Sequence, residues 1–145
     1  YDYSSLQRHI SIAIAYNTWY YLQVSNDIEF MANGGAEMFL EICRFWASKS
    51  KLEKETGKYS IKHVMGPDEF HEKYPGSDKG GLKDNAYTNL MARENLRYAA
   101  KVVERLQAGG SPAAPDLDLA ELSTVLAMHP LWSTSCLAPA CFRLS

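Results

Sequence analysis

The chain has 145 residues and a net charge of -2, with 22% charged and 46% hydrophobic side chains, so it can hold one compact globular unit. Lys and Arg are scattered among Asp and Glu, which gives no basic field, and no nucleic-acid partner is expected. Because no apolar run approaches the roughly 20 residues that span a bilayer, and Tyr1-Asp2-Tyr3-Ser4 is unlike a signal peptide, we expect a cytoplasmic protein without a membrane partner.

The first expected element is a helix from Ser4 to Val24. Its apolar residues recur at helical spacing along one stripe, which consists of Leu6, Ile10, Ala13, Ile14, Tyr16, Tyr20, Tyr21 and Val24. Ile12, Ala15 and Trp19 add apolar surface elsewhere, so this helix should be buried on most sides. Because the helical pattern begins almost at once and residue 1 is not Met, we interpret the chain as an internal fragment.

A second amphipathic helix follows after two breaks in the pattern. Asn26-Asp27 is expected to end the first helix and cap a short segment, which Gly34-Gly35 then interrupts. The second helix should end near Lys51, and its apolar residues are Met38, Phe39, Ile42, Cys43, Phe45 and Trp46. We interpret both Trp19 and Trp46 as core residues, since aromatics at helical spacing mostly lie in cores.

An extended run and a long loop precede the third helix. Alternation over residues 59–63 predicts a short strand or extended run, and residues 68–83 form a loop rich in Gly, Pro and charge. Asp84 is expected to cap a helix that ends at Gly109-Gly110, with a stripe of Tyr87, Met91, Tyr98, Val102 and Leu106. From Ser111 onward we expect a linker, a short helix at residues 118–128, and little order after about His129.

These elements predict an all-α fold in which helices pack on helices, with one short extended segment before the loop. Three or four helices that are apolar on more than one side cannot cover one another, so the natural protein should be larger. The three cysteines, Cys43, Cys136 and Cys141, are odd in number and show no C-x-x-C spacing. Neither a disulfide framework nor a metal site is therefore expected.

The stretch most informative for chemistry is Gly66-Pro67-Asp68-Glu69. A carboxylic acid that protonates a glycosidic oxygen must be held rigidly beside a sugar pocket, and a junction after Gly-Pro provides such a position. Phe70 and Tyr74 could shield the acid, raise its pKa by desolvation and stack on sugar rings. Asp68 competes with Glu69 for the role, and an acidic pair after Gly-Pro is in general more often a turn or a helix cap.

Several neighbouring residues allow two interpretations. His71 is of a type found in active sites, yet it could equally belong to a solvated loop face. Asn85, Tyr87 and Asn89 could line a sugar pocket, or Asn85 could form the helix entry and Tyr87 part of the core. His9 is interpreted as a core histidine rather than a catalytic one.

Six short motifs follow one another over residues 6–106, namely Arg8-His9-Ile10-Ser11, Ile14-Ala15-Tyr16, Gly35-Ala36-Glu37, Arg44-Phe45-Trp46-Ala47-Ser48, Gly66-Pro67-Asp68-Glu69-Phe70-His71 and Asn85-Ala86-Tyr87-Thr88-Asn89. In this order and spacing they resemble glycoside hydrolase family 65. The resemblance implies that residues 1–108 are part of an α/α barrel of six helical hairpins. Residues 109–145 would be a linker and an irregular tail, since no motif of the family is found there.

The same resemblance implies a catalytic role for Glu69 as general acid, with Asp68, His71, Asn85, Tyr87 and Asn89 as weaker substrate-binding candidates. The expected reaction is inverting phosphorolysis of an α-linked disaccharide, in which phosphate attacks the anomeric carbon and β-glucose 1-phosphate is released. An inverting hydrolase acting on trehalose, kojibiose or a similar α-glucoside is the alternative. A further alternative is a helical fragment without catalytic function.

No cofactor is expected, although inorganic phosphate would serve as co-substrate. The implied partners are an α-linked disaccharide, phosphate and the rest of the catalytic barrel, and the resemblance also allows a homodimer of the full-length protein. The Trp-Asp and Lys-Gln substrate motifs and the phosphate site of the family are not found in this chain. The run between Tyr74 and Lys83 is longer than in many family phosphorylases, which leaves the acceptor sugar undetermined.

Overall fold

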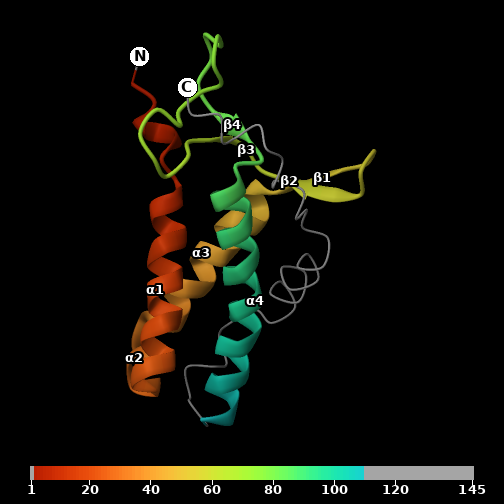
Figure 1. Cartoon of the computed structure of the whole chain (residues 1–145). Coiled ribbons are helices and arrows are strands. Elements are labelled where there is room, and N and C mark those ends of the chain that lie inside the picture. The colour runs from red at the N-terminus through yellow and green to blue at the C-terminus, as the bar shows by residue number, and fades with distance from the viewer. Residues whose placement is uncertain (1, 110–145) are drawn as a thin grey trace.

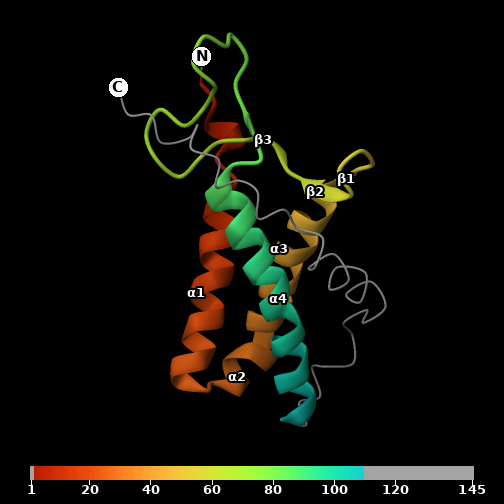
Figure 2. The same ribbon diagram turned by 45° about the vertical axis from the view of Figure 1, so that its right-hand side comes forward.

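Three long helices form the body of the protein in a computed structural model that describes residues 2–109. They are α1 (His9–Ser25), α3 (Ala36–Lys49) and α4 (Ala86–Ala108), and each packs against the other two. Figures 1 and 2 show them side by side, with the strands and the long loop gathered at one end. This arrangement confirms the predicted packing of helices on helices. The expected helix at 118–128 and the irregular tail lie outside the described residues.

The predicted breaks between the first two helices are confirmed. Asn26 ends α1 in the left-handed conformation (φ 52°), and its N–H donates to the carbonyl oxygen of Leu22. The carboxylate of Asp27 accepts a 2.8 Å hydrogen bond from the N–H of Phe30, which caps α2 (Ile28–Phe30). A kink follows at Gly34 (φ 122°) within η2 (Met31–Gly35), and α3 ends at Lys49, slightly before the expected position.

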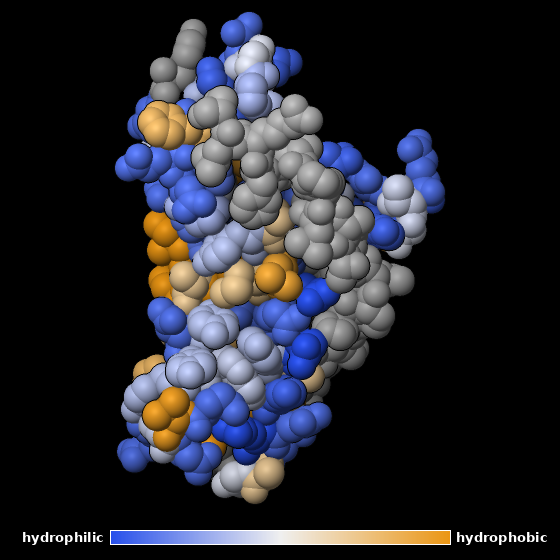
Figure 3. All heavy atoms as spheres, in the orientation of Figure 1, coloured by the Kyte–Doolittle hydropathy of each residue, from blue (hydrophilic) through white to orange (hydrophobic). Residues whose placement is uncertain are grey.

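The face that α1 buries differs from the predicted one. Ile12, Ala15 and Trp19, which were assigned to the rest of the cylinder, are buried against α3 and α4 together with Leu22. Much of the predicted stripe is exposed instead, with exposed fractions of 44–77% at Ile10, Ile14, Tyr20, Tyr21 and Val24. Figure 3 shows apolar surface along the edge of the molecule that α1 occupies in Figure 1. The helix is thus buried on one side only among the described residues.

Aromatic and polar contacts join the three helices into one core. The indole of Trp19 stacks on Tyr98 of α4 with ring centroids 4.8 Å apart, and Trp46 is 1% exposed. Both tryptophans are core residues, as predicted. The buried side chain of Asn95 donates a 2.9 Å hydrogen bond from Nδ2 to the carbonyl oxygen of Ile12, which fixes α4 against α1.

Two short antiparallel pairs of strands lie at one end of the helices. β1 (Lys51–Glu53) pairs with β2 (Lys58–Ser60), and β3 (Lys62–Val64) pairs with β4 (Leu82–Lys83). The predicted extended run over residues 59–63 is confirmed, although it divides into two strands at Ile61 and both partner strands were missed. Because β3 and β4 pair with each other, the loop between them starts and ends at the same place (Figure 1).

The cap of α4 lies one residue later than predicted. The side chain of Asn85, not of Asp84, accepts a 3.1 Å hydrogen bond from the N–H of Thr88. Asp84 adopts a left-handed conformation (φ 54°), and its carboxylate instead binds Ser60 at the end of β2, Ile61 between β2 and β3, and Asn89 of α4. At the other end of α4, Gly109 is the C-cap residue, as expected. No helix within residues 2–109 is long and apolar enough to cross a membrane.

Candidate active site

Glu69 lies on the loop that joins β3 to β4, beyond the ends of the long helices (Figure 1). This loop begins directly after Val64 and is folded back on itself by main-chain hydrogen bonds. The N–H of Gly66 donates to the carbonyl oxygen of His71 at 2.9 Å, and the N–H of Gly81 donates to the carbonyl oxygen of Glu72 at 2.7 Å. The carboxyl group of Glu69 is therefore carried by a short, closed turn.

The closed turn requires particular backbone conformations. Gly66 is buried, and a Cβ atom added to it would lie 2.6 Å from the Cβ of His71. Phe70 adopts a left-handed conformation with φ 63°, which is uncommon for a bulky residue and marks a sharp reversal of the chain. Because position 66 is a glycine, Gly66 and His71 can approach each other closely at the two ends of the turn. Asp68 and Glu69 lie between these two residues in the sequence.

An open hollow of about 390 Å³ adjoins Glu69. One wall comes from the first residues of the chain, which are held there because the N–H of Met65 donates a 3.0 Å hydrogen bond to the carbonyl oxygen of Leu6. The residues that line the hollow are Asp2, Tyr3, Ser4, Gln7, Met65, Glu69, Phe70 and Glu72. Sequence patterns did not identify Asp2, Tyr3 or Gln7, because they belong to no motif and lie far from Glu69 along the chain.

The shielding of Glu69 expected from Phe70 and Tyr74 is not observed. Glu69 is exposed, and the side chain of Phe70 has an exposed fraction of 83%. The hydroxyl of Tyr74 binds the main chain of Lys83 instead, donating to its carbonyl oxygen at 2.9 Å and accepting from its N–H at 3.0 Å. Among residues 2–109, no side chain therefore covers the carboxyl group of Glu69 enough to bury it.

Asp68 and His71 lie close to Glu69 along the chain, but neither lines the hollow. Asp68 is exposed, and its Oδ2 lies 3.8 Å from Nδ1 of His71, which is too long for a hydrogen bond. The Nδ1 atom of His71 is buried and has no hydrogen-bond partner among the described residues. His71 packs against Gly66 and helps to close the turn, so its contacts are with the loop itself.

The three candidates from the start of α4 also lie outside the hollow. Asn85 caps α4 through Thr88, and the amide of Asn89 donates a 3.3 Å hydrogen bond to Oδ1 of Asp84. The ring of Tyr87 meets His9 edge to face with centroids 6.2 Å apart, which places both residues at the junction of α1 and α4. These contacts organise the helix start, and a direct contact of these residues with sugar stays a prediction.

The charged residues that line the hollow are all acidic. Asp2, Glu69 and Glu72 contribute carboxylates, and none of the described lining residues is Lys or Arg. Such a surface can donate protons and accept hydrogen bonds from sugar hydroxyls, but it repels an anion such as phosphate. No group of three or more His, Cys, Asp or Glu side chains suited to a metal ion occurs in the described part of the chain.

Comparison with known proteins shows close relatives of this chain. Residues 1–126 match the family model "Glycosyl hydrolase family 65 central catalytic domain". The chain is 45% identical over 104 residues to trehalose 6-phosphate phosphorylase from Lactococcus lactis subsp. lactis, covering 72% of this chain and 13% of that protein. It is 40% identical over 102 residues to kojibiose phosphorylase from Caldanaerobacter subterraneus subsp. tengcongensis, covering 70% and 12% of the two chains.

An uncharacterized glycosyl hydrolase from Mycobacterium tuberculosis is 47% identical over 91 residues, covering 63% of this chain and 7% of that protein. The chain thus spans between 7% and 13% of the length of these three curated relatives.

Proposed function

Because the chain belongs to glycosyl hydrolase family 65, we propose that it forms part of the catalytic domain of an inverting α-glucoside phosphorylase. The observation that carries this proposal is the closed turn at Gly66-Pro67-Asp68-Glu69, which holds an accessible carboxyl group at the edge of a hollow. A hollow of about 390 Å³ falls within the usual range for small-molecule sites, which is roughly 300–1,000 Å³. The relatives named as phosphorylases support phosphorolysis as the reaction.

In the proposed reaction, Glu69 is the general acid. The bond between the anomeric carbon and the glycosidic oxygen breaks, and that oxygen leaves with the electron pair and takes the proton of Glu69. A phosphate oxygen attacks the anomeric carbon from the opposite face and forms the new bond, which gives β-glucose 1-phosphate and inverts the configuration. Phosphate here takes the place of the second carboxylate that an inverting hydrolase needs to activate water.

The negative charge of the hollow supports a reaction in which the general acid and the phosphate act on opposite faces of the sugar. Asp2, Glu69 and Glu72 repel a phosphate anion, so phosphate is proposed to bind cationic groups outside the described residues. The amide of Gln7 and the hydroxyl of Ser4 are suited to pair with sugar hydroxyls on the Glu69 side. Attack by phosphate from the far side is the geometry that inversion demands.

The exposed apolar face of α1 supports a larger catalytic domain. Ile10, Ile14 and Val24 would be covered by neighbouring helices if the three described helices were part of a barrel of six helical hairpins. In the same proposal, Asp68, His71, Asn85, Tyr87 and Asn89 are supporting residues around the sugar, and no organic cofactor is required.

The experiment that tests the proposed reaction uses the complete protein and a panel of trehalose, trehalose 6-phosphate, kojibiose, nigerose and maltose. Each substrate is incubated with and without inorganic phosphate, and glucose 1-phosphate and free glucose are measured separately. We expect one substrate to give β-glucose 1-phosphate only when phosphate is present. Release of glucose without phosphate would identify a hydrolase instead, and no turnover of any α-glucoside would contradict both assignments.

A further inference from the structure

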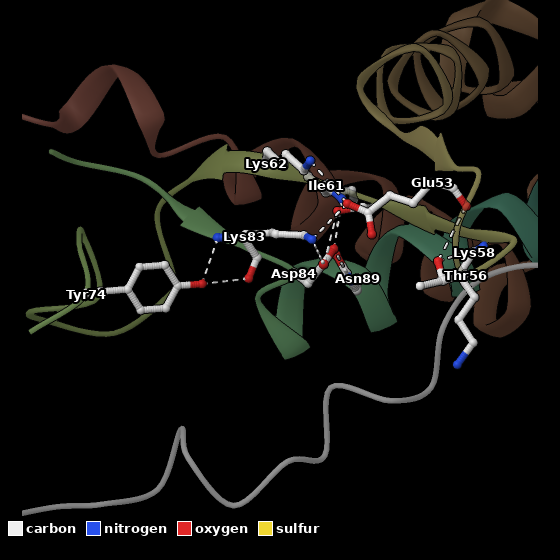
Figure 4. A network of polar contacts seen from close by, with 10 residues as sticks. Glu53, Thr56, Lys58, Ile61, Lys62, Tyr74, Lys83, Asp84 and Asn89 are labelled. Atoms are coloured by element: carbon white, nitrogen blue, oxygen red, sulfur yellow. Dashed lines mark hydrogen bonds and ion pairs between the residues drawn. The ribbon is translucent and has the colours of Figure 1, made fainter. Parts of the chain in front are cut away.

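Asp84 is a point at which several segments around the loop of Glu69 meet (Figure 4). Its Oδ2 accepts a 3.0 Å hydrogen bond from the hydroxyl of Ser60, at the end of β2. Its Oδ1 accepts from the main-chain N–H of Ile61 at 3.0 Å and from the amide of Asn89 at 3.3 Å. One carboxylate thus connects the end of β2 and the residue that precedes β3 with the first turn of α4.

Asp84 also binds Ile61 in the opposite direction. The N–H of Asp84 donates a 2.8 Å hydrogen bond to the carbonyl oxygen of Ile61, so both main-chain polar groups of Ile61 pair with Asp84. Ile61 is fully buried, and an unpaired polar group at such a position would be costly. The left-handed conformation of Asp84 (φ 54°) lets its N–H and its carboxylate face the same residue.

These contacts hold the two ends of the loop that carries Glu69. Ile61 directly precedes β3, from which the chain runs through Met65 into the closed turn, and Asp84 directly follows β4. Lys83, the last residue of β4, is held by the hydroxyl of Tyr74 and by an ion pair of 2.8 Å with Glu53 (Figure 4). A displacement at Asp84 would therefore move the start of the loop relative to its end.

We propose that Asp84 is a positioning residue for the general acid, an inference that rests on the proposed role of Glu69. Asp84 does not line the hollow, so it acts through β3 and not through contact with substrate. A misplacement of about 1 Å in a reacting group can cost about 10²-fold in rate, and a loop held at its two ends transmits such a shift. In this proposal Asp84 holds the loop that carries Glu69, although its position beside Asn85 in the sequence suggests only a helix cap.

Two substitutions of Asp84 distinguish the effect of its side-chain hydrogen bonds from the effect of its backbone conformation. Asn tolerates the left-handed region and keeps one oxygen for the N–H of Ile61, while its amide can donate to the hydroxyl of Ser60. Gly also tolerates this region but removes every side-chain contact of Asp84, including the hydrogen bonds to Ser60, Ile61 and Asn89. Asn26, an exposed left-handed residue (φ 52°) at the far end of α1, provides a matched control for introducing glycine.

The test compares Asp84→Gly, Asp84→Asn, Ser60→Ala and Asn26→Gly in the complete protein. The kcat on the natural disaccharide is divided by the kcat on glucosyl fluoride, both with phosphate, because fluoride needs little protonation to leave. Relative to the parent protein, we expect this ratio to fall by about tenfold or more in Asp84→Gly and to fall less in Ser60→Ala. In Asp84→Asn and Asn26→Gly it should stay within about threefold of the parent value.

Equal losses on both substrates in Asp84→Gly, or an Asn variant as impaired as the Gly variant, would overturn the positioning role. If Asp84→Gly does not fold, Ser60→Ala tests the positioning role in its place. An unchanged ratio of the two kcat values in Ser60→Ala would then contradict the inference. Glu69→Gln measured beside them separates the two hypotheses. A selective loss on the disaccharide in Glu69→Gln but not in the Asp84 and Ser60 variants rejects the positioning role alone, whereas no selective loss in Glu69→Gln rejects the proposed function.

Discussion

The main-chain N–H of Gly66 donates a 2.9 Å hydrogen bond to the carbonyl oxygen of His71, and this bond closes the turn that carries Glu69. The side chain of His71 packs directly on Gly66, where it occupies the space that a Cβ atom would need. Two residues of the Gly-Pro-Asp-Glu-Phe-His segment thus touch each other while the acid between them faces the hollow. The segment therefore forms a defined turn in addition to carrying the carboxyl group of Glu69.

This contact predicts the effect of Gly66→Ala. The new Cβ would lie 2.6 Å from the Cβ and 2.9 Å from Nδ1 of His71, so the turn has to open. Overpacking of this kind costs about 1–3 kcal/mol, and kcat of the complete protein should fall as well. Thermal unfolding and disaccharide turnover measure the two effects. Gly76→Asn is the control, because position 76 (φ 75°) has no heavy atom within 4 Å of an added Cβ; a normal Tm and kcat in Gly66→Ala would contradict the contact.

The stability of the loop should depend on pH through Glu53. The ammonium groups of Lys83 and Lys62, at 2.8 Å and 3.1 Å, bind this carboxylate and hold its pKa below the ordinary range. Correspondingly, the hydrogen bond to Glu53 raises the pKa of Lys83. A carboxyl whose pKa is lower in the folded protein stabilises the fold above its unfolded pKa, and this contribution is lost as the pH falls through the folded value.

Glu53→Gln should therefore be less stable than the parent protein at neutral pH, and the two should converge as the pH falls below about 4. Chemical denaturation at a series of pH values measures the difference. Glu55→Gln, at an exposed position in the turn of the same hairpin, is the control and should follow the parent throughout. A constant difference between Glu53→Gln and the parent at all pH values would show that the ion pairs contribute nothing.

Much of the helical core was predictable because its signals are local. Asn26, Asp27 and Gly34 interrupt the helical pattern with residues that favour caps and left-handed conformations, and the structure confirms these breaks. The Gly-Pro junction before Glu69 was identified for the same reason. Trp19 and Trp46 lie in the core as predicted, because large aromatics at helical spacing gain most from burial.

Features that depend on distant partners were not predictable. α1 is apolar around most of its circumference, so periodicity could not show that α3 and α4 cover the Ile12 side rather than the Ile10 side. Asp84 and Asn85 are both good helix caps, and the choice between them depends on Ile61, which is distant in sequence. The wall of the hollow at Tyr3 was missed for the same reason, since folding alone brings it beside Glu69.

Cys43 should be unreactive in the folded protein. Its side chain is 1% exposed, and desolvation by burial raises the pKa of the thiol. In a Cys136→Ser, Cys141→Ser background, a disulfide reagent should label Cys43 only after a denaturant unfolds the protein. Time courses of thiol labelling in native buffer and in guanidinium chloride measure this directly. Rapid, complete labelling in native buffer would show that the α3 and α4 interface is open.

The 145-residue chain alone should be inactive and should associate with itself. Ile10, Ile14, Tyr20, Tyr21 and Val24 expose apolar surface along one helix, which is the kind of patch that drives association. Light scattering with size-exclusion chromatography measures the mass, and Ile10→Gln with Ile14→Gln should shift the chain toward monomer. Asn17→Gln, at an exposed polar position of the same helix, is the control. A monomeric chain that cleaves an α-glucoside would contradict this expectation.

The proposed role of Glu69 as general acid is tested most directly by Glu69→Gln in the complete protein. Gln keeps the size and hydrogen-bonding reach of the side chain but cannot supply the proton, so kcat on the natural disaccharide should fall by about 10²–10⁴-fold. Asp68→Asn, the matched control in the same turn, should lose less. With glucosyl fluoride and phosphate, Glu69→Gln should keep most of its turnover, because fluoride leaves without a proton. Near-normal turnover of the disaccharide, or an equal loss on both substrates, would contradict the assignment of Glu69 as the acid.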